Sequence, residues 1–104
     1  MIDKHAVKLA VEYLERCFAK GEPADLVGML NHVDYFERVV MVREEVQDAL
    51  KECPSVYLQR VDGRVIFTQS FGDRQIIEED VNRNIQMYHD KFWYEYRQLQ
   101  SRDK

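Results

Sequence analysis

The dipeptide Asp62-Gly63 constrains the fold of this chain more than any other short stretch. It lies inside the segment VYLQRVDGRVIFTQ, residues 56–69, between two runs rich in β-branched and aromatic side chains. A type I′ turn needs a positive φ at both central residues, and Asp-Gly is a preferred pair for it. The segment therefore predicts a β-hairpin with a two-residue turn.

The predicted hairpin has one apolar face. With a two-residue turn, Leu58 lies opposite Phe67, Arg60 lies opposite Val65, and alternate side chains share a face. The apolar face consists of Val56, Leu58, Val65 and Phe67. Two short strands are only marginally stable alone, so we expect this face to pack on helices.

The rest of the chain has the apolar periodicity of helices. The pattern predicts helices over residues 3–20, 23–31, 34–52 and 74–101. Gly21 marks the end of the first helix, and Pro23 fits the first turn of the second. Asp34 and Glu37 have the spacing of a capping box, so they predict the start of the third helix. Asp73 is the expected cap of the fourth helix.

Composition indicates one domain that spans residues 1–104. Hydrophobic residues make up 45% and charged residues 33% of the 104 positions, a balance typical of globular domains. No apolar run is long enough to cross a membrane, and the charged N-terminal sequence lacks a signal-peptide core, so we expect a cytoplasmic protein. Cys17 and Cys53 fall on apolar helix faces and are expected to be buried free thiols; a disulfide or redox pair is the alternative.

The order of these elements resembles a winged helix-turn-helix domain. ADLVGMLNHVDYFERV corresponds to the helix-turn-helix, and VYLQRVDGRVIF corresponds to the wing. The resemblance implies a mainly α fold with one β-hairpin, in the order α-α-α-β-β-α, that ends in a long C-terminal helix. It also implies that residues 34–52 form the recognition helix. Winged helices serve both as DNA-binding and as protein-interaction modules.

The charge of the expected recognition helix disfavours nucleic acid as the main partner. Residues 34–52 contain six acidic and three basic side chains, a net charge of −3, and the whole chain carries −4. If the protein binds DNA, the candidate contacts are Tyr35, Arg38, Arg60 and Arg64. The alternative interpretation is that the acidic helix is a solvated surface and that Arg60 and Arg64 are solvated charges that discourage strand pairing at the edge.

Nothing in the sequence assembles a catalytic site. His5, His32 and His89 are far apart, no nucleophile is paired with a base, and no glycine-rich loop precedes a helix. We therefore expect that the protein is not an enzyme and that it has neither a cofactor nor a metal site.

The C-terminal helix is unusually rich in aromatic residues. Residues 74–101 would form a helix of about 40 Å, longer than one small domain can cover. The residues predicted to form a dimer interface are Tyr88, Phe92, Trp93, Tyr96 and Leu99. The alternative is that these aromatic residues belong to the core, with an exposed Trp93. The sequence thus predicts a non-enzymatic homodimeric module that contacts a protein partner, and a DNA-binding transcriptional regulator is the alternative.

Overall fold

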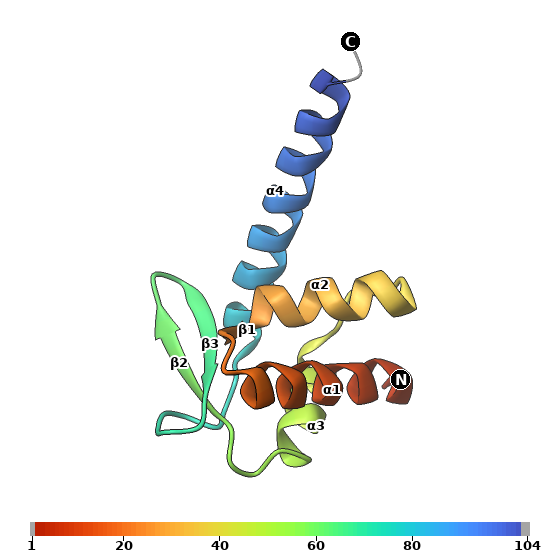
Figure 1. Cartoon of the computed structure of the whole chain (residues 1–104). Coiled ribbons are helices and arrows are strands. Elements are labelled where there is room, and N and C mark those ends of the chain that lie inside the picture. The colour runs from red at the N-terminus through yellow and green to blue at the C-terminus, as the bar shows by residue number, and fades with distance from the viewer. Residues whose placement is uncertain (1, 103–104) are drawn as a thin grey trace.

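The computed structural model describes residues 2–102, with side chains for residues 2–92. Four helices and three short strands make up this part of the chain (Figure 1). The elements are α1 (Lys4–Lys20), β1 (Ala24–Asp25), α2 (Leu26–Glu37), α3 (Arg43–Lys51), β2 (Tyr57–Val61), β3 (Arg64–Thr68) and α4 (Glu78–Arg102). α2 lies alongside α1, α3 lies on another side of α1, and the hairpin stands beside these helices. The prediction of a mainly α fold with a β-hairpin is confirmed.

The first helix, α1, has the bounds that the sequence predicts. The side chain of Asp3 accepts hydrogen bonds from the backbone amides of His5 and Ala6, which caps the first turn. Gly21 ends the helix in the left-handed region with a φ of 68°. Both signals are local, and the apolar stripe between them is buried against α2 and α3.

The predicted start of the second helix at Pro23 is wrong. Pro23 precedes β1, a two-residue strand in which Ala24 pairs with Phe67 of β3. The side chain of Asp25 accepts a hydrogen bond from the amide of Gly28 at 2.7 Å and caps α2. β1 makes the sheet three-stranded, in the order β1-β3-β2.

The predicted break between Asn31 and Asp34 is also wrong. α2 continues to Glu37 and ends at Arg38, which adopts a left-handed φ of 60°. Asp34 is an interior residue of α2, where its carboxylate accepts a hydrogen bond from the hydroxyl of Tyr88 at 2.5 Å. The capping-box spacing therefore marks no helix start here.

The third helix is shorter than expected and is fixed at its start by Glu45. This buried carboxylate accepts hydrogen bonds from the amide of Val42, at 2.9 Å, and from the amide of Asp3, at 2.7 Å. One side chain thus satisfies free amides at the start of both α3 and α1.

The hairpin has the predicted turn and register. Asp62 and Gly63 have φ values of 52° and 79°, and Leu58 pairs with Phe67 as expected. The predicted apolar face, Val56, Leu58, Val65 and Phe67, is buried in the core. β3 is the central strand because β1 occupies its other edge.

The last helix begins four residues later than predicted. The backbone of Asp73 exchanges two hydrogen bonds with Leu58, at 2.6 and 2.9 Å, so Asp73 pairs with β2 rather than capping a helix. α4 starts at Glu78, packs on α2 and β3, and then continues beyond the rest of the fold (Figure 1). The molecule measures 48 Å along its longest axis and about 30 Å across.

Candidate interaction surfaces

Arg60, one of the two arginines of the hairpin, is bound to two carboxylates. Its Nε donates to Asp80 at 3.0 Å, and its Nη1 donates to Asp73 at 3.0 Å. Asp80 is buried at the start of α4, and its hydrogen bond with Arg60 lowers the pKa of the carboxyl group. The same pairing raises the pKa of the guanidinium group. Arg60 therefore joins the hairpin to α4.

Arg64, the second arginine of the hairpin, forms an ion pair with Asp25. Asp25 is the residue that caps α2, so its carboxylate serves the helix and the arginine together. Both arginines expected at the tip of the wing thus already have acidic partners within the domain. A phosphate would have to share or compete with these carboxylates for each guanidinium group.

Asn84 locks the hairpin onto α4 and is a residue that sequence reasoning missed. Its buried side chain accepts a hydrogen bond from the amide of Val65 at 3.2 Å and donates to the carbonyls of Gly63 and Asp80. The available signal was its position, because Asn84 lies three residues after Val81, on the buried face of the helix. A polar residue in an apolar stripe needs a partner, and the hairpin supplies it.

The net charge of α3 is closer to zero than the net charge of the helix predicted over residues 34–52. α3 contains two bases, Arg43 and Lys51, and three acids, Glu44, Glu45 and Asp48, which gives −1 instead of −3. Arg43 pairs with Glu44 at 2.9 Å, Lys51 pairs with Asp48 at 3.5 Å, and Glu45 is buried. The difference arises because three acids and one base of the predicted helix lie outside α3: Asp34 and Glu37 belong to α2, Arg38 ends it, and Glu52 follows α3.

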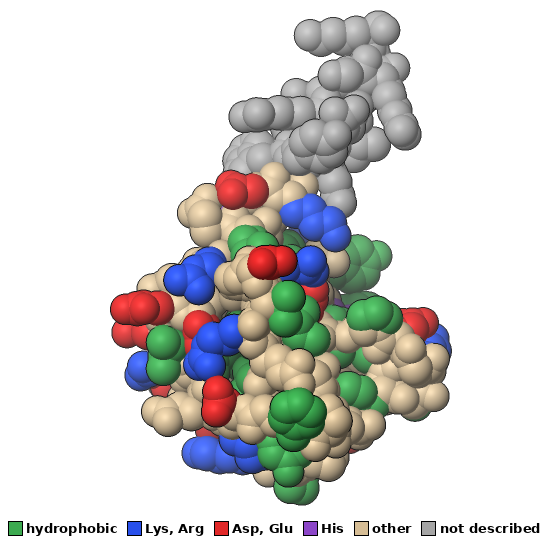
Figure 2. All heavy atoms as spheres, turned by 90° about the vertical axis from the view of Figure 1, so that its left-hand side faces the viewer, with side chains coloured by type: hydrophobic (Ala, Val, Ile, Leu, Met, Phe, Trp, Pro, Cys, Tyr) green, Lys and Arg blue, Asp and Glu red, His purple; other side chains and the backbone are tan. Residues whose placement is uncertain are grey.

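Three of the four residues proposed for nucleic-acid contact lie at the two ends of α2, and the fourth, Arg60, contacts Asp73 and Asp80 instead. Tyr35 and Arg38 are exposed at its C-terminal end, whereas Arg64 pairs with the cap at its N-terminal end. The 12 residues of the helix separate these ends by about 18 Å. Figure 2, which faces the hairpin, shows acidic and basic side chains interspersed, with no patch of one sign.

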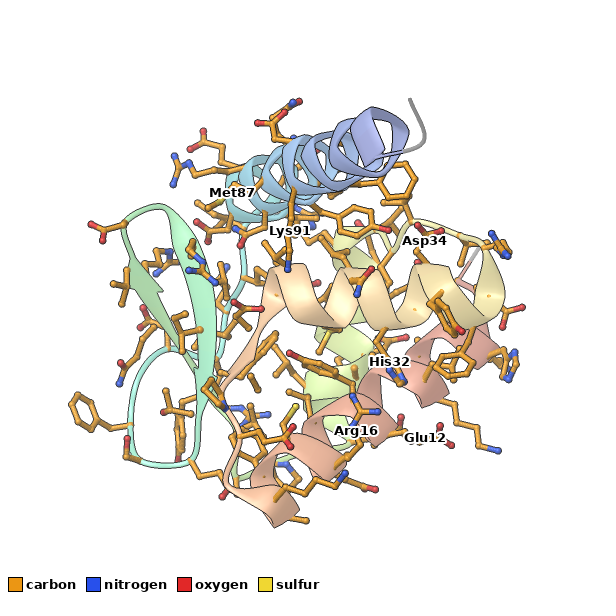
Figure 3. The ribbon with its side chains drawn as sticks, turned by 45° about the horizontal axis from the view of Figure 1, so that its top comes forward. Glu12, Arg16, His32, Asp34, Met87 and Lys91 are labelled. Carbon is orange, nitrogen blue, oxygen red and sulfur yellow. The ribbon has the colours of Figure 1, made fainter. Side chains whose placement is uncertain are left out.

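An exposed apolar cluster lies where α2 turns into α3. Tyr35 and Phe36 are 73% and 60% exposed, and their rings pack edge to face with their centroids 4.9 Å apart. The ring of His32 packs against the ring of Phe36, with the two centroids 5.0 Å apart. Figure 3 shows His32 pointing toward α1. Burial and the nearby Arg16 lower the pKa of His32. Clustered apolar side chains at a surface are typical of protein contacts.

The aromatic residues of α4 differ in their surroundings. Tyr88, expected at a dimer interface, is buried within its own domain, where it holds α4 on α2 through Asp34. Phe92 lies one turn further and is 51% exposed. Figure 3 shows Met87 and Lys91 on the side of α4 that faces the N-terminal half of α2. The side chains of Trp93, Tyr96 and Leu99 lie outside the described residues.

The cysteines are buried and are not joined by a disulfide, as the sequence predicts. Burial raises the pKa of the Cys53 thiol. Within the described part of the chain, no group of three or more His, Cys, Asp or Glu residues could hold a metal ion. In the same part, no helix combines the length and the apolar character that a membrane span requires.

Compared with protein-family models, with curated proteins and with solved structures, the chain gives no match. Its function is therefore inferred from the arrangement of its own residues.

Proposed function

We propose that this chain is a non-enzymatic, winged-helix-like interaction module that acts as a homodimer. The order α1-β1-α2-α3-β2-β3 and the sheet order β1-β3-β2 support the winged-helix part, because the hairpin then flanks a helical core as a wing does. Two buried, unpaired thiols fit a reducing compartment such as the cytoplasm.

One observation favours a protein partner over DNA: both arginines of the hairpin are ion-paired inside the domain. Arg60 contacts Asp73 and Asp80, and Arg64 contacts Asp25. A wing that binds phosphates needs cations that are available to them. The mixed charge of the hairpin face also suits a protein surface better than a phosphate backbone (Figure 2).

The dimer part of the proposal depends on α4. Its 25 residues span about 37 Å, which exceeds the width of the domain that it crosses. Phe92 is half exposed at the point where the helix leaves α2, and the sequence continues with Trp93, Tyr94 and Tyr96. A symmetric second copy is the commonest partner for such an element.

The experiment compares Phe92→Ala with Phe71→Ala by light scattering in a dilution series. Phe71 is a matched control, because it is an exposed phenylalanine in a loop away from α4. Loss of a central interface aromatic typically removes 2 kcal/mol or more, so Phe92→Ala should weaken the dimer by about 30-fold and Phe71→Ala should leave it unchanged. Equal dimer dissociation constants for both variants and the unmodified chain would contradict the role of α4.

The second candidate is a DNA-binding regulator, for which the charge of α3 is less unfavourable than the sequence predicts. That helix carries −1 rather than the −3 expected from the sequence, and Arg38 is exposed before it. The repulsion from a phosphate backbone is correspondingly weaker.

A further inference from the structure

A groove with an apolar floor runs between α1 and α3, two helices that lie side by side in Figure 1. Its volume is about 820 Å³. Ile2, Val7 and Val11 provide the floor, and Val7 and Val11 are one helical turn apart on α1. The groove therefore offers a strip of apolar surface parallel to a helix axis.

The charge of the side chains on the α1 rim of this groove changes sign halfway along the helix. Lys4 and Lys8 line it in the first half of the helix, and Glu12 and Glu15 line it further on. All four side chains are exposed and none of them forms an ion pair within the described residues. The α1 rim is therefore basic at one end and acidic at the other.

The α3 rim reinforces the acidic end. Glu45, near the start of α3, contacts the amide of Asp3, so the starts of the two helices lie together. Beyond the end of α3, Glu52 and Glu15 line a common hollow. The remaining rim residues, Asp48 and Lys51, pair with each other. The groove thus has two cations at one end and three carboxylates at the other.

We propose that this groove binds an amphipathic helix of a partner protein, running parallel to α1. The acidic first turn of that helix would lie on Lys4 and Lys8, and its basic last turn on Glu12, Glu15 and Glu52. Helices commonly carry acids in the first turn and bases in the last, because both complement the helix dipole. Leucine-type side chains at i, i+3, i+4 and i+7 fill an apolar groove of this kind.

The length of the rim sets the length of the partner helix. The 12 residues from Lys4 to Glu15 span about 18 Å, which corresponds to about three helical turns. This inference deepens the proposed interaction function by naming the chemistry of the partner, and it involves a surface separate from the exposed part of α4.

The test uses two synthetic peptides of about 14 residues with leucines at helical spacing. Both peptides are held helical by a hydrocarbon staple on the opposite face, and they have the same composition. One carries glutamates in its first turn and lysines in its last turn; the other has these charges exchanged. Fluorescence anisotropy should show that the first binds about tenfold more tightly at low salt, with the ratio falling as salt screens the rim. Equal binding of the two, or no binding, would overturn the proposal.

A charge-exchange variant provides the matched control. Lys4→Glu and Lys8→Glu combined with Glu12→Lys and Glu15→Lys preserve the composition of four exposed positions, and a thermal melt verifies the fold. This variant should prefer the second peptide. If its preference stays unchanged, the peptides bind elsewhere and the proposal fails. Light scattering on the same samples reports the dimer separately, so failure of the groove and failure of the dimer are distinguishable.

Discussion

Arg74 joins distant segments of the chain through its guanidinium group. Nη2 donates to the carbonyl of Leu50 at 2.6 Å, and Nη1 donates to the carbonyls of Pro54 and Val56 at 2.7 and 2.5 Å. Both nitrogens approach the carbonyl of Cys53 at 3.4 Å. The side chain thus caps the last turn of α3 and holds the connection to β2 against the segment before α4.

Replacement of Arg74 by alanine should destabilise the fold. Hydrogen bonds from a charged donor contribute about 1.5–3 kcal/mol, so we expect the free energy of unfolding to fall by about 2 kcal/mol. Arg74→Lys keeps the charge but not the planar fork, and it should lie between the alanine variant and the unmodified chain. Urea unfolding measures these values, and an alanine variant as stable as the unmodified chain would contradict the role of Arg74.

Asp80 should make part of the stability depend on pH. The Arg60 guanidinium holds the pKa of this carboxyl group below its ordinary value of 3.8. The ionised form therefore stabilises the fold above about pH 4, and this contribution is lost as the pH falls through the lowered pKa of the folded state. Asp80→Asn should be less stable than the unmodified chain at neutral pH, and the difference should narrow in acid. Thermal melts between neutral and strongly acidic pH test this; a constant difference would contradict it.

At the scale of elements, the sequence predicted those helix ends that are determined by residues within the same helix. α1 has an acid cap at Asp3 and a glycine stop at Gly21, and both act within its own turns. β1 could not be predicted because its two residues are a strand only by pairing with β3, more than 40 residues later. The end of α2 at Arg38 has no glycine or proline to mark it.

The contacts of the candidate surfaces, too, could be predicted from the sequence only where they are local. The turn at Asp62-Gly63 has the conformation that the sequence predicts, whereas the role of Phe92 at a dimer interface stays a prediction. The acidic partners of Arg60 and Arg64 do not follow from any spacing, because each ion pair joins residues between 13 and 39 positions apart. Tertiary packing alone determines whether these arginines are available for a ligand.

The turn of the hairpin provides a prediction at this scale. Gly63 has a φ of 79°, and a Cβ placed on it would lie 2.9 Å from Cδ of Arg83. Gly63→Val should destabilise the protein by about 1 kcal/mol or more, because a β-branched residue resists a positive φ. Gly63→Asn tolerates this conformation better and serves as the control. Thermal melts with equal midpoints for the valine variant and the unmodified chain would contradict the prediction.

At the scale of the whole molecule, the hairpin and α4 behave as one unit. Asn84 binds the backbone of Gly63 in the hairpin turn and of Val65 in β3, and Arg60 binds Asp80 in the first turn of α4. The direction of α4 therefore fixes the orientation of the hairpin. In a dimer held by α4, the distance between the two hairpins would be set by the same contacts.

Duplex DNA should bind weakly. The chain carries −4, and both hairpin arginines are ion-paired, so we expect no tight binding to random duplex at physiological salt. Gel shifts at several salt concentrations measure this. Submicromolar binding with a steep salt dependence, lost when Arg60 and Arg64 are changed to alanine, would favour the DNA-binding regulator instead.

The mass of the unmodified chain in solution tests the central claim most directly. One chain has a mass of 12.5 kDa, so a homodimer has twice that mass, about 25 kDa. Light scattering from about 1 to about 100 μM should give the dimer mass at the upper concentrations, with dissociation on dilution. A mass of 12.5 kDa throughout this range would contradict a dimer held by α4, and the exposed Phe92 would then require another explanation.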